Sequence, residues 1–447
     1  MQTPFLPHTD DDIRQMLEVL GVSSVDSLFA DIPASILFKG RLLLPSAAAE
    51  AEIKKELLLL SQKNKDADRF VSFLGGGSYD HYIPSIVKHL AGRSEFYTSY
   101  TPYQAEISQG LLQIYFEYQT MICELTNMDV SNASMYDGAT ALAEAVLMAY
   151  NVHGRKKVLI CGAMNPETIQ VLKTYTHNMD ISIEIIPFLD GTTELSLLKE
   201  KCKEDIACVL VQQPNFFGCL EDVFEIEKIT HAAGATFVVS VDPLSLGLII
   251  PPGDYNADIV VGEGQGLGNE MNFGGPLLGF FAAKKEFVRR MPGRIIGETV
   301  DKEGKRAFTL TLQTREQHIR REKATSNICS NEALCATMAT IYLSWLGREG
   351  IREVSSQCAA KAQFAAGLIA KNTNYKLKFS APFFKEFVIE SKKSAAQVNK
   401  ALLENGILNL IDLGRFFPQL KNNLLVCVTE KRTKEEITRL VEVLGKV

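Results

Sequence analysis

The sequence predicts an α/β protein with a mainly parallel central sheet in a large domain, followed by a smaller α+β domain. Between about residues 155 and 265, short β-branched runs alternate with segments of helical character. Runs that are apolar on both faces and separated by helices are typical of a parallel sheet covered on both sides. From about Asn331 a helix leads into more widely spaced strands, and 447 residues are enough for two or three domains.

The N-terminal segment reads as a helical arm. Thr9 and the three aspartates after it predict a helix start, and Gly21 predicts its end after Leu20. A second helix is expected over residues 46–62. Between them, Phe29–Pro45 is apolar with little periodicity, so it should pack on another surface, such as another subunit. The expected division is an arm over 1–68, a large α/β domain over 69–330 and a small α+β domain over 331–447.

The strands of the large domain are expected in regular order, with helices starting near Pro166, Glu194 and Asp222. The runs that predict these strands are Lys157–Gly162, Ile181–Phe188, Ala207–Pro214, Thr236–Pro243 and Ala257–Gly264. In the small domain the candidates are Lys376–Phe379, Phe387–Ile389 and Leu424–Thr429. Ligands of such parallel sheets bind at the carboxyl ends of the strands.

Composition excludes several classes of function. A net charge of -6 argues against nucleic-acid binding, and the basic run Arg315–Lys323 reads as a solvated helix face. No stretch approaches the ~20 apolar residues of a membrane span, and the N-terminus lacks the pattern of a secretory signal. The nine cysteines are scattered without a C-x-x-C pair, so we expect buried thiols in a cytosolic chain and no metal site.

Two segments follow the ends of predicted strands. Asp242 comes where an apolar strand meets solvent, and it could pair with the protonated ring nitrogen of a cofactor. A helix cap is the alternative that position alone favours. Gly262–Gly279 is rich in glycine, which allows close backbone approach to a ligand or another chain. It contains no Lys, His or Cys, so it offers no nucleophile or base, and it does not match a dinucleotide-binding motif.

Polar loops supply further candidates. Tyr136–Val146 opens an Ala-rich helix whose N-terminus could hold an anion, but Asp137 would repel a phosphate and reads better as a cap. The lone His81 reads as a structural residue. A loop over Phe96–Gly110 gathers tyrosines with an amide and a carboxylate, which indicates either a lined pocket or an interface, or plain packing.

Four long stretches of the sequence resemble one family. Taken in order along the chain, Phe73–Pro84, Tyr97–Ala145, Ala257–Ala282 and Thr314–Leu334 are similar to glycine decarboxylase, the P-protein of the glycine cleavage system. Some members of this family are one chain of two homologous halves, and others divide the halves into α and β subunits. In length and motifs the chain resembles the split α subunit, also called subunit 1.

The resemblance implies a pyridoxal-phosphate fold of type I and a cofactor site that is vestigial in this chain. In the family the Schiff-base lysine lies on the β half, whereas Gln265 stands near that place here and cannot form an imine. Asp137 stands where the β half has the serine of its phosphate loop, and Asp242 matches the partner of the ring nitrogen. Pyridoxal phosphate should therefore be held by the partner β subunit.

The resemblance also implies the reaction and the partners. With its β subunit, in an α2β2 assembly, the chain would decarboxylate glycine and pass the aminomethyl group to lipoylated H-protein in a bacterial cytoplasm. It would hold no catalytic residue by itself and would enclose the shared site. The residues expected to face that site are Tyr97, Tyr100, Tyr103 and Gln104, with His81 and the Gly75–Gly77 loop nearby.

Two alternatives remain open from the sequence. The chain could be an autonomous pyridoxal-phosphate enzyme, such as an aminotransferase-like protein, with its lysine displaced to Lys284 or Lys285. These residues follow LLGFFAA, at a strand end that we expect to face away from the cofactor position. The chain could instead be a purely structural partner of the β subunit, in which case the tyrosine loop could be altered freely.

Overall fold

The computed structural model describes residues 7–312, 317–326 and 330–447. Arg315 and Cys329, which the sequence analysis considered, lie outside these residues. The chain divides into two compact units, Met1–Asn64 and Lys65–Val447, which are described separately below. The further boundary near residue 330 stays a prediction.

Over its described residues, 7–64, the N-terminal unit has two α-helices and no core of its own. Helix α1 (Asp10–Leu20) begins at Thr9, whose side chain accepts from the backbone of Asp12, and ends at Gly21 with φ 67°, as predicted. Helix α2 (Glu50–Ser61) starts later than expected, after Ala49, whose backbone N–H is bonded by Glu52. A short 3₁₀ helix, η1 (Val25–Phe29), lies between them. None of the described residues of this unit is buried.

The second unit is built on a seven-stranded sheet of order β1-β9-β8-β7-β6-β2-β3. Its strands are β1 (Val130–Ser131), β2 (Lys157–Cys161), β3 (Ser182–Ile186), β6 (Ile206–Gln213), β7 (Thr236–Val241), β8 (Ile259–Glu263) and β9 (Gly279–Ala283). Strands β3, β2, β6, β7 and β8 are parallel, and β9 runs antiparallel to β8. The mainly parallel sheet is therefore confirmed. Phe188, expected in the second strand, instead begins a small hairpin, β4 (Phe188–Leu189) with β5 (Thr192–Thr193).

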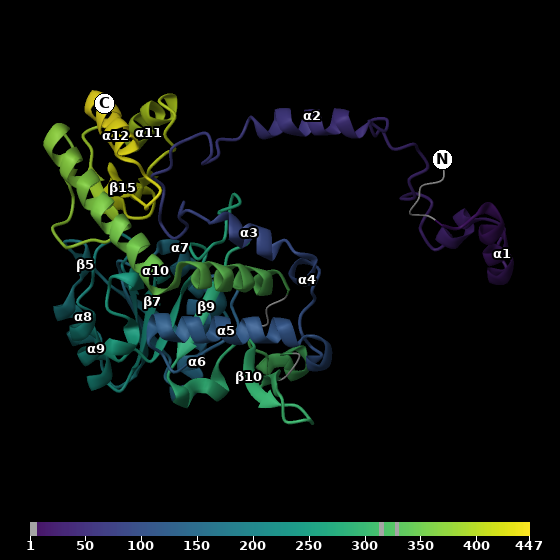
Figure 1. Cartoon of the computed structure of the whole chain (residues 1–447), viewed down its shortest axis with the longest axis horizontal. Helices are drawn as coiled ribbons and strands as arrows, with labels where there is room; N and C mark the ends of the chain where they lie inside the picture. The colour runs from purple at the N-terminus through teal and green to yellow at the C-terminus, as the bar shows by residue number, and fades with distance from the viewer. Residues whose placement is uncertain (1–6, 313–316, 327–329) are drawn as a thin grey trace. The chain divides into compact units, whose positions relative to one another are not determined.

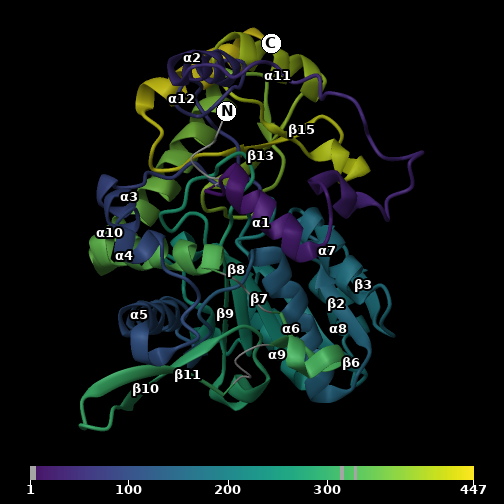
Figure 2. The same ribbon diagram turned by 90° about the vertical axis from the view of Figure 1, so that its right-hand side faces the viewer.

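Helices cover both faces of this sheet (Figures 1 and 2). Successive residues of β2 enter opposite cores: Leu159 packs with helices α5, α8, α9 and α10, whereas Val158 packs with α6 and α7. This alternation explains why the central strands are apolar on both faces. The covering helices are α5 (Gln109–Thr126), α6 (Gly138–His153), α7 (Pro166–Thr176), α8 (Leu195–Lys201), α9 (Val223–Ala232) and the long α10 (Ser330–Asn372).

A smaller antiparallel sheet forms the C-terminal α+β part, as expected. Its order is β12-β13-β15-β14, and helices α11 and α12 pack with it around a separate core. Its elements are β12 (Lys376–Leu377), β13 (Glu386–Glu390), α11 (Ala395–Glu404), β14 (Ile411–Asp412), β15 (Asn423–Cys427) and α12 (Lys434–Lys446). Helix α10 joins the two parts, because its residues up to Val354 pack with the core of the large sheet and those from Ala362 onward pack with the small core. Its Gly347 has a non-helical conformation.

Shorter elements complete the second unit. Figure 2 shows β10 and β11 as a hairpin that extends from the large sheet. The bounds are α3 (Ser85–Ala91), α4 (Ser94–Tyr97), η2 (Ala105–Ile107), η3 (Pro243–Gly247), β10 (Ile295–Val300) and β11 (Arg306–Thr311). Over the described parts of the chain, no helix has both the length and the apolar character needed to cross a membrane.

Candidate functional site

A cavity of about 320 Å³ lies at the carboxyl ends of the central strands, where the parallel sheet predicts a ligand site. We call it the strand-end cavity. It is lined by the glycine loop that contains Gly76 and Gly77 and by the start of α6 with Asp137. Asp242, which follows β7, and Glu263, which ends β8, also line it. The structure thus brings Asp137 and Asp242 to one site, although they are far apart in the sequence.

Asp242 has two partners. One carboxylate oxygen accepts a hydrogen bond from the backbone N–H of Leu244 at 3.2 Å, which caps η3. The other oxygen lies 2.7 Å from the Nζ of Lys385, whose side chain is 2% exposed. Asp242 is therefore a helix cap, as its position in the sequence favoured. It also pairs with a cation, but this cation is Lys385 of the chain itself.

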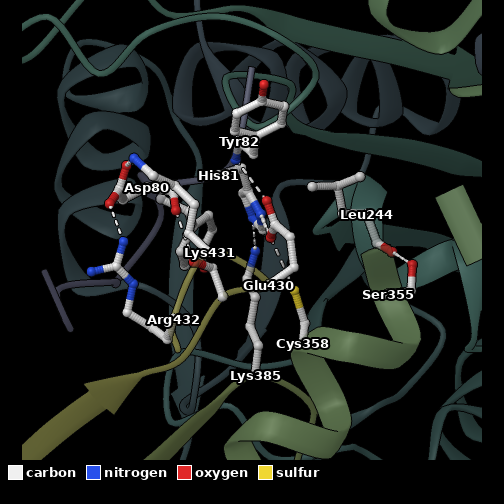
Figure 3. Close-up of polar contacts among 12 residues, drawn as sticks. Asp80, His81, Tyr82, Leu244, Ser355, Cys358, Lys385, Glu430, Lys431 and Arg432 are labelled. Carbon is white, nitrogen blue, oxygen red and sulfur yellow. Dashed lines mark hydrogen bonds and ion pairs between the residues drawn. The ribbon is translucent and has the colours of Figure 1, made fainter. Parts of the chain in front are cut away.

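Lys385 lies directly before β13 and reaches from the small sheet into the large domain. Its Nζ lies 2.9 Å from His81 Nε2 (Figure 3). The same atom lies 3.4 Å from the centroid of the Tyr79 ring. Burial is the largest single effect and lowers the pKa of the Lys385 amine, but the charge and hydrogen bond of Asp242 together with the nearby Cys427 and Cys358 outweigh burial and raise the pKa. Lys385 is accordingly an ammonium ion that faces a carboxylate, an imidazole and an aromatic ring.

His81 links Lys385 to a second carboxylate. Its Nδ1 lies 2.6 Å from Glu430 Oε2, and the other oxygen of Glu430 accepts from the backbone N–H of Tyr82 at 2.6 Å. Burial raises the pKa of Glu430, but the charge and hydrogen bond of His81 outweigh it and lower the value to about 2. His81 is buried within this network, as a structural residue would be.

Cys358 completes a group of three possible metal ligands that the sequence did not reveal. The ligand atoms of His81, Cys358 and Glu430 lie within 4.8 Å of one another. Their mutual hydrogen bonds already use the imidazole and carboxylate, and the Lys385 ammonium lies on the other ring nitrogen. Burial also raises the pKa of the Cys358 thiol, which opposes the thiolate that a metal requires. The group is best described as a hydrogen-bonded cluster.

Gln265 connects the loop of Tyr79, which lines the cavity, to the loop that follows β8. Its side-chain oxygen accepts from the backbone N–H of Tyr79 at 2.9 Å, and its amide nitrogen donates to the carbonyl of Asn269 at 2.7 Å. The residue is 2% exposed, so both ends of its amide are used in the interior. Gln265 therefore has a structural role at the place where the family resemblance expects a lysine.

The N-terminus of α6 is satisfied by two acidic side chains. Asp137 accepts from the backbone N–H of Thr140 at 2.7 Å, which confirms the predicted cap. Glu263 accepts from the backbone N–H groups of Gly138 and Leu278, both at 2.9 Å. Burial raises the pKa of Glu263 to about 8, against the effect of these donors. The chain's own oxygens thus occupy two of the first amides of α6 that could bind an anion, those of Gly138 and Thr140.

The tyrosine loop lies at a different place. Tyr100, Tyr103 and Gln104 line a groove of about 630 Å³ that has no lining residue in common with the strand-end cavity. Tyr97, at the end of α4, and Tyr100 are each 68% exposed. The guanidinium of Arg294 lies 5.4 Å from the Tyr103 ring centroid. The loop is an exposed, aromatic and polar surface, and its part in a shared site stays a prediction.

The two alternative lysines lie at the opposite edge of the sheet. Strand β9 is antiparallel to β8, so its end is next to the start of β8, as expected. Lys284 forms an ion pair of 2.6 Å with Asp258 there, and the backbone N–H of Lys285 donates to Asp129. Neither residue is among those that line the strand-end cavity.

Four ionisable residues of the site were missed by the sequence analysis: Lys385, Glu386, Glu430 and Glu263. Glu386 accepts from the Gly76 N–H and the Tyr79 hydroxyl, and burial raises its pKa to about 7. The signal that could have found two of them is the adjacent Lys385–Glu386 pair inside an otherwise apolar strand run, since buried charges need partners.

Comparison with known proteins places this architecture in a family. A model of the family described as glycine cleavage system P-protein matches residues 3–444. The chain belongs to the glycine cleavage system P-protein family. It is 54% identical over 441 residues to a probable glycine dehydrogenase (decarboxylating) subunit 1 of Carboxydothermus hydrogenoformans, covering 99% of both chains. A protein of the same name from a Geobacillus species is 52% identical, over 99% of this chain and 98% of that protein.

Solved structures of P-protein and of other enzymes share the fold. A crystal structure of glycine decarboxylase (P-protein) in inhibitor-bound form matches with a TM-score of 0.90 and 44% identity, covering 100% of both chains. The apo cysteine desulfurase of Thermococcus onnurineus matches with a TM-score of 0.63 and 16% identity, over 90% of this chain and 99% of that one, so it shows the fold alone. The fold is that of type I pyridoxal-phosphate enzymes.

The described residues of this P-protein chain do not fit pyridoxal phosphate. The cofactor needs a carboxylate for its ring nitrogen, donors for its phosphate and a lysine for its aldehyde. Asp242 is already paired with Lys385, and the donors at α6 are taken by Asp137 and Glu263. Gln265 cannot form an imine. The Lys385 amine faces the carboxylate that would bind the ring nitrogen, which is para to the aldehyde-bearing carbon, so it cannot replace the missing lysine.

Proposed function

We infer that this chain is the α subunit of glycine decarboxylase and that it works with a β subunit that holds the pyridoxal phosphate. Together the two would decarboxylate glycine and transfer the aminomethyl group to lipoylated H-protein. The observation that carries the proposal is made at the strand-end cavity: Lys385 pairs with the carboxylate that would bind the ring nitrogen, and Asp137 and Glu263 accept from two of the amides that would bind the phosphate. The name subunit 1 of its relatives supports a partner subunit.

The tyrosine loop is the part of this chain that suits a shared site. Its groove is exposed and combines aromatic faces with hydroxyl and amide groups, as in Tyr100, Tyr103 and Gln104. Such a surface could close over a neighbouring active site, exclude water and position the small substrate. In this proposal Tyr97, Tyr100, Tyr103 and Gln104 form one wall of the active site that the two subunits share. The assembly is α2β2, and the chain acts in the cytoplasm.

Reconstitution tests the proposal. The absorbance near about 400–430 nm, where a lysine imine of the cofactor absorbs, is measured on this chain with added pyridoxal phosphate and again after mixing with the β subunit. Glycine-dependent exchange of carbon dioxide is measured in parallel. We expect both signals only in the mixture. A borohydride-reducible imine on this chain alone would show that the assignment is wrong.

The wall itself predicts the effect of removing single hydroxyl groups. We expect Tyr100→Phe or Tyr103→Phe to lower kcat of the reconstituted complex by about five- to thirtyfold, because a lost hydrogen bond to a reacting group costs on the order of 1–2 kcal/mol. Tyr150→Phe is the control, since Tyr150 lies near the C-terminal end of α6, away from the cavity. If both loop variants left the rate of carbon dioxide exchange unchanged, the result would indicate that this chain is a purely structural partner of the β subunit.

A further inference from the structure

Lys385 is the most unusual charged residue of the chain. Its side chain is 2% exposed, and its ammonium lies deep between the two sheets of the second unit. Burying an ammonium ion is costly unless it is paired and hydrogen-bonded. The proposed reaction, in which the partner holds the cofactor, assigns this residue no role.

The contacts of Lys385 match those that a protonated cofactor ring would make. The carboxylate of Asp242 at 2.7 Å is the group that would pair with the ring nitrogen, and the ammonium faces the Tyr79 ring at 3.4 Å. The third contact of the ammonium is with His81 Nε2, and the Nδ1 atom of the same ring lies against Glu430 (Figure 3). The positive charge opposite Asp242 is therefore supplied from the small sheet.

The other charged end of the cofactor also has a replacement. Oxygen atoms of Glu263 and Asp137 accept from the first amides of α6, where a phosphate would be held. Both ends are thus satisfied without a ligand.

We propose that the Lys385 ammonium replaces the ring nitrogen of the cofactor as the cation opposite Asp242, and that this pair ties the start of β13 to the end of β7 in the absence of any ligand. The proposal rests on the proposed absence of the cofactor from this chain. Lys385 acts here as a positioning residue. It stabilises the contact between the small sheet and the large one, and it keeps the strand-end cavity closed to a cationic ring.

A double-mutant cycle on the chain alone tests this tie. The variants are Lys385→Met, Asp242→Asn and the two combined, and the measurement is the thermal unfolding midpoint. Each single change leaves one buried charge without its partner, so we expect each to lower the midpoint by about 3–5 °C. The combined variant removes both charges, and we expect it to recover most of the loss.

A lysine–aspartate pair in the same sheet provides the matched control. Lys284 pairs with Asp258 at the opposite edge, where the lysine side chain is 29% exposed. We expect Lys284→Met to lower the midpoint by no more than about 2 °C, since partly exposed pairs contribute little.

Rescue by a small cation gives a second readout. Lys385→Ala removes the side chain that carries the charge, so propylammonium ions should raise the unfolding midpoint of this variant and leave that of Lys385→Ala/Asp242→Asn unchanged. The proposal would be overturned if the Lys385→Met/Asp242→Asn variant were no more stable than Lys385→Met. Equal shifts for Lys385→Met and Lys284→Met, or a rescue that does not depend on Asp242, would also overturn it. An imine on the wild-type chain would instead contradict the proposed function, so the two failures can be told apart.

Discussion

Removing residues 1–64 is expected to leave the remainder folded and to weaken its binding to the β subunit by about a hundredfold or more. All the hydrophobic clusters of the described chain consist of residues from Val71 onward, so the chain without residues 1–64 keeps its cores. About half of the exposed large hydrophobic side chains among the described residues lie in the arm, including Leu43 at 100% and Val19 at 87%. Covering two or three such side chains is enough for a hundredfold effect.

Binding of the β subunit to full-length and truncated chains can be compared by calorimetry, with circular dichroism to check the fold. A milder variant, Leu43→Ser, should weaken binding less, and Phe364→Ser, at an exposed position of α10, is the control. The arm would instead belong to the chain's own fold if truncation lowered the unfolding midpoint strongly while the affinity of the surviving folded protein stayed the same.

Gly218→Ala is expected to destabilise the chain by more than about 3 kcal/mol. Gly218 has φ +81°, which an alanine adopts only with strain, and an added Cβ would lie 1.9 Å from the carbonyl oxygen of Glu386. That carbonyl cannot move alone, because Phe384 donates its N–H to Gly218 and Glu386 is held by Gly76 and Tyr79. The clash would push away the strand that brings Lys385 to the site.

Urea unfolding of the full chain measures this effect, and Gly234→Ala separates strain from collision. Gly234 also has a positive φ, +62°, but an added Cβ would meet only the side chain of Arg155 at 3.6 Å. Its cost should be about 1 kcal/mol. Equal effects of the two variants would show that the backbone conformation, and not contact with β13, makes Gly218 necessary.

The sequence could predict features that depend on neighbouring residues. The strands were found from their apolar runs because a parallel sheet buries both faces, and α1 was bounded correctly because Thr9 and Gly21 act on their own helix. Asp137 was recognised as a cap for the same reason. The start of α2 was misplaced because the run of alanines before Glu50 favours a helix without marking where it begins.

The sequence by itself determined that this chain is an α/β protein of the P-protein family without the expected lysine, because Gln265 and the long motifs can be read locally. Only the tertiary structure decided what fills the vestigial site. Lys385, Glu430 and Glu263 reach it from segments that are distant in the sequence. In the sequence, a charged residue next to a strand is indistinguishable from a solvated one. When the packing of the two sheets buries this residue, the fold must also supply a partner for its charge.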